Sequence, residues 1–298
     1  MAATTAQREG RDRGGGPMKG KERRAPPPTF RTAVRRQAEA LGVPADAFER
    51  ALILGQLVAL LSQHPRMRHA VAFKGGAIMR LVDQSPRLSR DLDSSELQGR
   101  RVEEKWVRDA LSTTAARRVV LGVERIVRRG TASISFLVRC RPLTGGEEIP
   151  ITVSVNWEEP LVLPPEQALI ELPNREQVRV PVVHRAERAA EKVRAFLGRG
   201  EANDAHDLHW YGTRVLRTGD WKVLPHLVRR KLHLLRVRPN TDLHRRFEEM
   251  RANAAGQWRR GQGLVVVANP PVWEEVDQQL TRLKRLIPQR LRVGRQRQ

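Results

Sequence analysis

The hydrophobic pattern of the chain changes near Pro181, and this change limits the fold more than any other feature of the sequence. Before Pro181, short strand-like runs alternate with helical segments, whereas the residues after it are helical for most of their length. Strands confined to one half of a chain and helices to the other are typical of α+β proteins. The pattern therefore predicts two lobes, a mixed sheet with flanking helices in the first half and a helical C-terminal lobe.

Four segments of the first half are expected to be strands. The most regular covers Ile149 to Glu158, where apolar residues occupy one face and Thr152, Ser154, Asn156 and Glu158 occupy the other. Such a strand is half-buried and presents a polar working face. The other strands are expected over 71–73, 119–127 and 132–139, and helices over 29–41, 77–82, 101–117 and about 185–197. A further helix is expected from Asp46, with Asp46 and Glu49 at capping-box spacing.

Composition divides the chain into two tails and two lobes. Residues 1–28 are rich in Gly, Arg and Pro and lack apolar periodicity, so we expect a disordered basic tail. Residues 29–183 are expected to form the sheet-containing domain and residues 184–281 the helical lobe. Residues 282–298 contain seven basic and no acidic side chains and are expected to form a second basic tail.

The 298 residues have a net charge of +22, about half of it outside the two basic terminal regions. Such an excess suits a polyanionic partner, because Lys and Arg at phosphates release counterions. An arginine-rich composition is the alternative explanation, and an aromatic content of 4% does not indicate a base-stacking platform. No apolar run approaches the roughly 20 residues of a membrane span. With a single cysteine, Cys140, no internal disulfide can form, and we expect a cytoplasmic protein.

Two short motifs in the first half carry the candidate chemistry. Asp91 and Asp93 on a strand point to one face, with α-carbons roughly 6.6 Å apart. Carboxylates this close need a shared proton or a cation, and hard oxygen ligands favour Mg²⁺ or Mn²⁺ over zinc. Upstream, Gly75 and Gly76 open a helix whose free N–H groups can hold a phosphate. A phosphate cradle beside a carboxylate pair is typical of metal-assisted phosphoryl or nucleotidyl transfer.

The order and spacing of these motifs give them specificity. The stretch from Phe73 to Arg80, followed by Arg87 to Asp93, resembles the first signature of the AbiEii/AbiGii nucleotidyltransferases. Those proteins are toxin components of bacterial abortive-infection, type IV toxin–antitoxin systems with a DNA polymerase β-like fold. A second block resembles the same family in the same order, and the resemblance covers about residues 71–211. The second block consists of Glu191–Ala195, Arg199 and Asn203–Leu208.

The resemblance implies a role for each matching residue. The triphosphate pocket would be formed by Lys74, Gly75, Gly76 and Ser89, and the metal would be held by Asp91 and Asp93. From the helical lobe, Lys192 would meet the nucleotide phosphates and Asp207 would complete the pocket. Without the family match, Lys192 reads as an ordinary solvated helix lysine. Asp204 and Asp207 share a helix face and could equally be capping or salt-bridging residues.

The sequence also departs from the family pattern. Many relatives carry a third carboxylate where this chain has Ser154, and the usual Arg before Asp204 is Asn203. Glu158 shares the polar face of the same strand, but it lies about 13 Å from Ser154 along that strand. Loss of a general base slows transfer without abolishing it, because positioning and metal electrostatics carry most of the catalysis.

Other candidate residues are assigned structural roles. His206 and His209 beside Asp207 look like a metal set, but a polar helix face is the favoured interpretation. Trp210 and Tyr211 are expected to pack in the core. Cys140 is expected to be a buried small hydrophobe rather than a nucleophile.

The sequence predicts a metal-dependent nucleotidyltransferase that takes a nucleoside triphosphate and acts as the toxin of a two-gene system with an antitoxin protein. The basic body favours RNA as the acceptor, with tRNA the main candidate. One alternative is transfer to a small hydroxyl-bearing molecule, which a basic pocket would repel if the molecule were cationic. Another is a catalytically impaired RNA-binding protein, for which Ser154 and Asn203 are the support.

Overall fold

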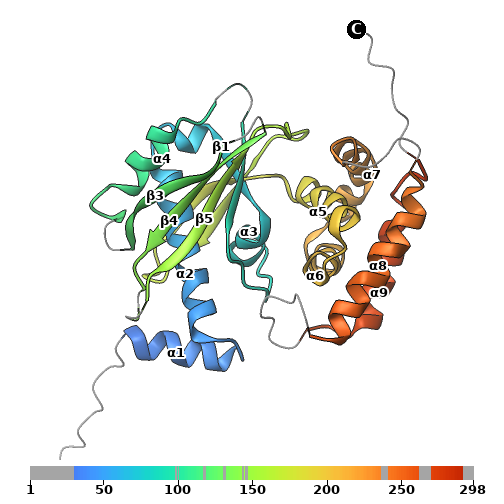
Figure 1. Cartoon of the computed structure of the whole chain (residues 1–298), viewed down its shortest axis with the longest axis horizontal. Coiled ribbons are helices and arrows are strands. Elements are labelled where there is room, and N and C mark those ends of the chain that lie inside the picture. The colour runs from blue at the N-terminus through green and yellow to red at the C-terminus, as the bar shows by residue number, and fades with distance from the viewer. Residues whose placement is uncertain are drawn as a thin grey trace, which may run out of the picture.

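A seven-stranded mixed sheet is built from the first half of the chain (Figure 1). The computed structural model describes residues 30–97, 99, 101–116, 119–129, 132–142, 144, 147–235, 241–261 and 270–290. Within these residues the strand order is β3-β4-β5-β2-β1-β7-β6. The strands are β1 (Val71–Lys74), β2 (Leu92–Glu96), β3 (Val120–Arg129), β4 (Ser133–Cys140), β5 (Ile149–Asn156), β6 (Glu166–Glu171) and β7 (Gln177–Val182).

The register at the centre of the sheet brings the sequence motifs together. Strand β2 pairs antiparallel with β1 and parallel with β5. Asp93 of β2 lies opposite Lys74 on one side and opposite Ser154 on the other. The expected strand over 149–158 is confirmed as β5, whose residues 151, 153 and 155 are buried while 152, 154 and 156 are partly exposed. The polar face of β5 therefore lies on the same side of the sheet as Asp93.

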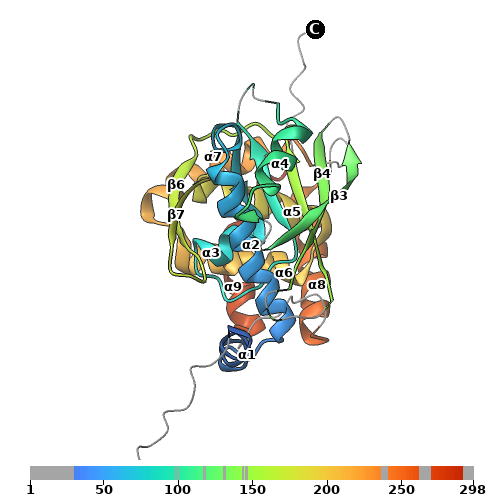
Figure 2. The same ribbon diagram turned by 90° about the vertical axis from the view of Figure 1, so that its left-hand side faces the viewer.

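Helices α2 and α4 cover one face of this sheet (Figure 2). Their apolar side chains share one hydrophobic core with strands β1 to β7. The expected capping box is wrong, because α2 begins after Pro44 without a side-chain cap and buried Glu49 instead accepts hydrogen bonds from Thr144. The helices of this half are α1 (Phe30–Ala40), α2 (Ala45–Gln63), α3 (Gly75–Leu81) and α4 (Glu104–Leu111), with a 3₁₀ turn over Met67–His69.

The second half folds as helices around a separate hydrophobic core. Its elements are α5 (Arg185–Arg199), α6 (Ala202–Trp210), the π-helical turn η3 (Tyr211–Val215), α7 (Thr218–Leu232), α8 (Leu243–Arg259) and α9 (Trp273–Lys284). The expected start of a tail at residue 282 is wrong, because Leu283 and Ile287 are buried in this core. The expected tail over 1–28 lies outside the described residues.

The chain passes from the sheet to the helices within a few residues. Strand β7 ends at Val182 in the sheet, and α5 begins at Arg185 in the helical lobe. The β6–β7 hairpin was not expected from the sequence, and it extends the sheet beyond β1. Among the described residues, no helix has both the length and the apolar character needed to cross a membrane.

Candidate active site

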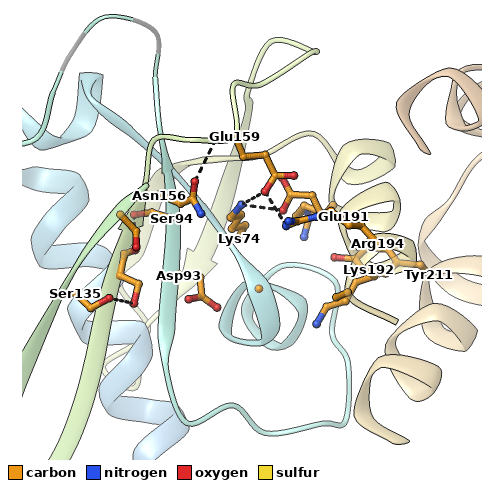
Figure 3. A pocket seen from close by; sticks show the side chains of 15 residues that line it. Lys74, Asp93, Ser94, Ser135, Asn156, Glu159, Glu191, Lys192, Arg194 and Tyr211 are labelled. Carbon is orange, nitrogen blue, oxygen red and sulfur yellow. Dashed lines mark hydrogen bonds and ion pairs between the residues drawn. The ribbon is translucent and has the colours of Figure 1, made fainter. Parts of the chain in front are cut away.

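A cavity of about 300 Å³ lies between the central strands of the sheet and α5 (Figure 3). Strands β1, β2, β4 and β5 provide one wall, and α5 provides the other. Both halves of the chain are therefore needed to form the site. Its lining includes Lys74, Gly75, Asp93, Ser94, Ser133, Ser135, Ser154, Asn156, Glu159, Arg188, Glu191, Lys192, Arg194, Ala195 and Tyr211.

Asp93 points into this cavity from β2 (Figure 3). Among the described residues, its carboxylate accepts no hydrogen bond and forms no ion pair. Burial raises the Asp93 pKa; Lys74 and Lys192 act to lower it, and Asp91 raises it further. The expected geometry is corrected for Asp91, which precedes the start of β2 at Leu92 and is exposed. The two carboxylates nevertheless lie close enough to repel each other.

Gly75 and Gly76 allow the backbone to approach the site. Gly75 has a φ of +76°, and a Cβ at this position would lie 2.7 Å from Asp93 Oδ2. A Cβ at Gly76 would collide with the Arg87 guanidinium and lie 2.9 Å from Ser89 Oγ. Ser89 in turn donates a hydrogen bond to the Asp91 carbonyl oxygen at 3.1 Å. The structure thus brings the glycine pair, Ser89 and the two aspartates into one neighbourhood.

Lys74 ends β1 and is held at the cavity by two carboxylates (Figure 3). Its Nζ lies 3.0 Å from Glu191 Oε2 and 3.5 Å from Glu159 Oε2. Burial acts to lower the Lys74 pKa, but Glu191 and Glu159 outweigh it and the pKa is raised. Lys74 therefore stays charged beside Asp93 over the physiological range.

A buried ion network surrounds Lys74 and was not foreseen from the sequence. Lys231 of α7 lies 2.6 Å from Glu187, 3.1 Å from Glu191 and 3.2 Å from Glu159. Glu187 also accepts hydrogen bonds from the backbone of Val162 and Leu163, after β5. The network therefore connects α7, α5 and the segment after β5. Its members are too far apart in the sequence for spacing to reveal it.

Lys192 and Asp207 meet on the helical side of the site. Lys192 Nζ lies 2.8 Å from Asp207 Oδ2, and Arg87 contacts the same carboxylate through Nε at 2.7 Å and Nη2 at 3.1 Å. Burial acts to raise the Asp207 pKa, but Arg87 and Lys192 outweigh burial and hold it below its ordinary range. Lys192 is therefore a partly buried, paired lysine rather than a solvated one. Asp204, paired with Lys192 and Arg199, is a salt-bridging residue.

Ser154 occupies the position of the missing third carboxylate, next to Asp93. Its Oγ shares a hydrogen bond with Ser135 Oγ at 2.9 Å. Glu158 is exposed and lines a neighbouring hollow, so it is not part of the Asp93 cavity. Glu159 lies in the cavity instead, because the strand ends at Asn156 and the Asn156 side chain accepts a hydrogen bond from Glu159 N, forming a turn.

Three other residues considered in the sequence, Tyr211, Cys140 and His206, are buried. Tyr211 is 1% exposed and belongs to the helical core, as expected. Cys140 is buried, as expected, and burial raises its thiol pKa to about 12. His206 is buried against Asp207 and stacks on Trp258, with ring centroids 6.5 Å apart. The expected polar helix face is thus wrong for His206, which packs inside the lobe.

Comparison with known proteins identifies the family. The family model described as the nucleotidyltransferase AbiEii toxin of type IV toxin–antitoxin systems matches residues 57–282, which is most of the chain. The chain belongs to this family. It is therefore a nucleotidyltransferase toxin, with a nucleoside triphosphate as substrate and an antitoxin as partner. No match was found among curated proteins.

A solved structure shares the fold of this AbiEii-family protein. MenT4, a nucleotidyltransferase toxin from Mycobacterium tuberculosis H37Rv, is similar with a TM-score of 0.55 and 23% sequence identity, over 86% of this chain and 99% of that chain. JHP933 from Helicobacter pylori aligns with a TM-score of 0.48 and 14% identity, over 81% of this chain and 91% of that chain. The MenT4 likeness supports the α+β fold expected from the sequence.

Proposed function

We propose that this toxin transfers a nucleotide from a nucleoside triphosphate to RNA, with tRNA as the preferred acceptor and Mg²⁺ or Mn²⁺ as the cofactor. The observation that carries the proposal is the Asp93 carboxylate, which faces the cavity without a protein partner beside Gly75. The same proposal places the protein in the cytoplasm and its activity in abortive infection.

The residues around Asp93 fit a hard divalent cation. An unpartnered carboxylate whose pKa is raised by burial gains most from a nearby positive charge. Asp93 and the adjacent Asp91 would hold the ion through oxygen atoms, which Mg²⁺ and Mn²⁺ prefer. When bound, the ion would polarise a phosphoryl oxygen and neutralise charge that develops during transfer. Among the described residues, no cluster of three His, Cys, Asp or Glu side chains suited to a metal occurs.

The triphosphate would be held between the glycine pair and Lys192. Gly75 lines the cavity and lets Asp93 approach the backbone, and Gly76 does the same for Arg87 and Ser89. Lys192 supplies a compact positive charge, and its contact with Asp207 positions it. We therefore assign Asp207 a positioning role, since its carboxylate is fully buried between Arg87 and Lys192. Lys74 would contribute a second charge at the cavity.

The charge of the cavity gives only a weak preference for its acceptor. Its lining contains four cationic and three anionic side chains, so the excess positive charge of the protein lies mostly elsewhere. Repulsion of a small cationic acceptor from the cavity is therefore weaker than the sequence alone suggested. The choice of RNA rests on the net charge of +22, which favours a large polyanion that also contacts the surrounding surface.

The missing carboxylate at Ser154 predicts a slow enzyme. Glu159 lies in the same cavity, but it is committed to Lys74, Lys231 and Arg194. Its carboxylate is occupied by these three cations and is not free to contact an acceptor hydroxyl. Activation of the acceptor hydroxyl would then depend on positioning and on the metal rather than on a dedicated base.

Transfer assays with each labelled nucleoside triphosphate and total RNA test the proposal directly. The assay compares wild-type protein with Asp93→Asn, in Mg²⁺, in Mn²⁺ and after chelation. The matched control is Asp109→Asn, which removes an exposed carboxylate of α4. We expect labelled RNA only from wild type and the control, and only with metal. Label in a small molecule instead of RNA would refute the acceptor, and label that survives chelation or Asp93→Asn would refute the metal site.

A further inference from the structure

A second hollow, of about 660 Å³, lies beside the catalytic cavity at the β6 and β7 side of the sheet. It is bounded by the end of α3, the start of β6, the start of α5 and the π-helical turn η3. Four arginines line it, namely Arg185, Arg188, Arg214 and Arg217, and we call it the arginine hollow. None of the residues assigned to the triphosphate or the metal lines it.

The carboxylates of the arginine hollow are already neutralised. Asp83 pairs with Arg188 through two contacts of 2.5 and 3.1 Å. Glu166 pairs with Arg185 through Nη2 at 2.5 Å and Nε at 3.1 Å. Arg214 and Arg217 are exposed, and within the described part of the chain neither forms an ion pair. Two positive charges therefore remain at the hollow without a carboxylate partner.

The walls of the hollow are held in place by contacts that do not use these two arginines. Trp210 donates a hydrogen bond to the Asp83 carbonyl at 3.0 Å, and Arg188 holds the Asp83 side chain. The turn η3 follows α6 directly and carries Arg214 to the rim. The planar forks of guanidinium groups match phosphate oxygens.

Arg188 forms part of the wall of both the arginine hollow and the catalytic cavity, and its side chain is buried between them in its pair with Asp83. A polymer whose end occupies the catalytic cavity must leave across an adjoining surface. The hollow on the other side of the cavity also contains two arginines, but Arg194 is paired with Glu159, and Arg199 is paired with Glu201 and Asp204. The arginine hollow differs in its two arginines that have no ion pair within the described chain. This charge next to the cavity favours a phosphodiester chain that continues from the cavity over an acidic protein segment, which needs no contact with the cavity.

We propose that the arginine hollow binds phosphates of the RNA acceptor while the end of that RNA occupies the catalytic cavity. The proposal rests on RNA being the acceptor. Arg214 and Arg217 would each contact a phosphate and hold the RNA without touching the reacting atoms. Their removal should therefore weaken RNA binding but leave the handling of the nucleoside triphosphate unchanged.

The test compares wild type with the double variant Arg214→Gln, Arg217→Gln. The control is Arg229→Gln, Arg230→Gln, which removes two exposed charges from α7 away from the hollow. Binding of fluorescent tRNA is measured without nucleotide over a range of salt concentrations, and transfer kinetics are measured separately. We expect the double variant to bind tRNA about tenfold more weakly, with a salt slope smaller by about one per arginine. The KM for nucleotide and kcat at saturating RNA should stay at wild-type values.

Different results overturn the two proposals. Equal tRNA affinity and salt slope in the double variant and the control would refute the arginine hollow, even if wild type transfers nucleotide to RNA. Wild-type protein that binds tRNA through the hollow but transfers no nucleotide to it would refute RNA as the acceptor and leave the hollow only as an RNA-binding surface. Unchanged tRNA binding with loss of neutralisation by the antitoxin would assign the hollow to a protein partner instead.

Discussion

Lys231 offers the sharpest test of how the two lobes are held together. Its side chain is 2% exposed and contacts Glu187, Glu191 and Glu159. Burial acts to lower the Lys231 pKa, but Glu191 and Glu159 outweigh burial and raise it. The stability it contributes is therefore present below the ordinary lysine pKa and is lost only as pH rises through the raised value. Near neutral pH the network has its full strength.

The change Lys231→Met keeps the length of the side chain and removes the charge. It leaves buried carboxylates without one of their cations, and breaking a buried ion pair in this way costs about 3–5 kcal/mol. For a protein of this size, each kcal/mol lowers Tm by roughly 2–4 °C, so the expected loss is roughly 6–20 °C. Burial acts to raise the Glu191 pKa, whereas Lys74 and Lys231 both act to lower it, so this pKa should be higher in the variant. The difference in stability between wild type and variant should therefore become smaller as the pH is lowered.

Urea unfolding and melting curves measure this loss, with Lys222→Met as the control on the same helix at an exposed position. Adding Glu187→Gln to Lys231→Met should recover part of the stability, because one stranded charge is removed while the amide oxygen still accepts a backbone hydrogen bond. A loss below about 1 kcal/mol for Lys231→Met, or a loss equal to that of the control, would show that the network does not hold the lobes.

Three further outcomes are expected. Asp93→Asn should lower transfer at least about 10²-fold, yet raise the Tm of the metal-free protein, because burial disfavours the ionised form of Asp93. An unchanged Tm, or the same rise in Asp109→Asn, would contradict this. Ser154→Asp should raise transfer by up to about 10²-fold and lower the Tm of the metal-free protein, and Mg²⁺ should restore that Tm. Thr152→Asp on the same strand face should not raise transfer. No gain in rate for Ser154→Asp would show that a missing base is not what limits the enzyme. Cys140 should not react with thiol reagents below about pH 10 in the folded protein, because burial raises its pKa to about 12. The stability that the buried thiol contributes should be lost as the pH rises towards that value. Rapid modification at neutral pH would show that the strand opens.

Local patterns predicted the centre of the fold well. The alternation in β5 and the short run before Gly75 specify strands that are confirmed, because their side-chain period matches their burial. The β6–β7 hairpin was missed, since its strands are six residues long and β6 is mostly exposed, so its apolar signal is weak. The motif residues were identified by order and spacing, but their meeting depends on the pairing of Lys74 with Asp93 across two strands.

The parts of the site that the sequence did not reveal depend on turns and on distant segments. If the in–out alternation of β5 continued past Asn156, Glu158 would lie on the polar face. The strand instead ends in a turn at Asn156, which brings Glu159 into the cavity. Lys231 lies 72 residues after Glu159, and no local pattern distinguishes it from Lys222 on the same helix. The conformation of one turn and the packing of one helix decided these contacts.

The position of Lys231 late in the chain has a consequence for synthesis of the toxin. Glu159, Glu187 and Glu191 all leave the ribosome before Lys231, so during elongation three acidic side chains lack the cation that contacts all of them. Glu191 of α5 can contact Lys74 earlier, but the ion network around that contact is completed only when α7 has emerged. A ribosome that stalls before the end of α7 therefore releases a chain without the complete network beside the active site.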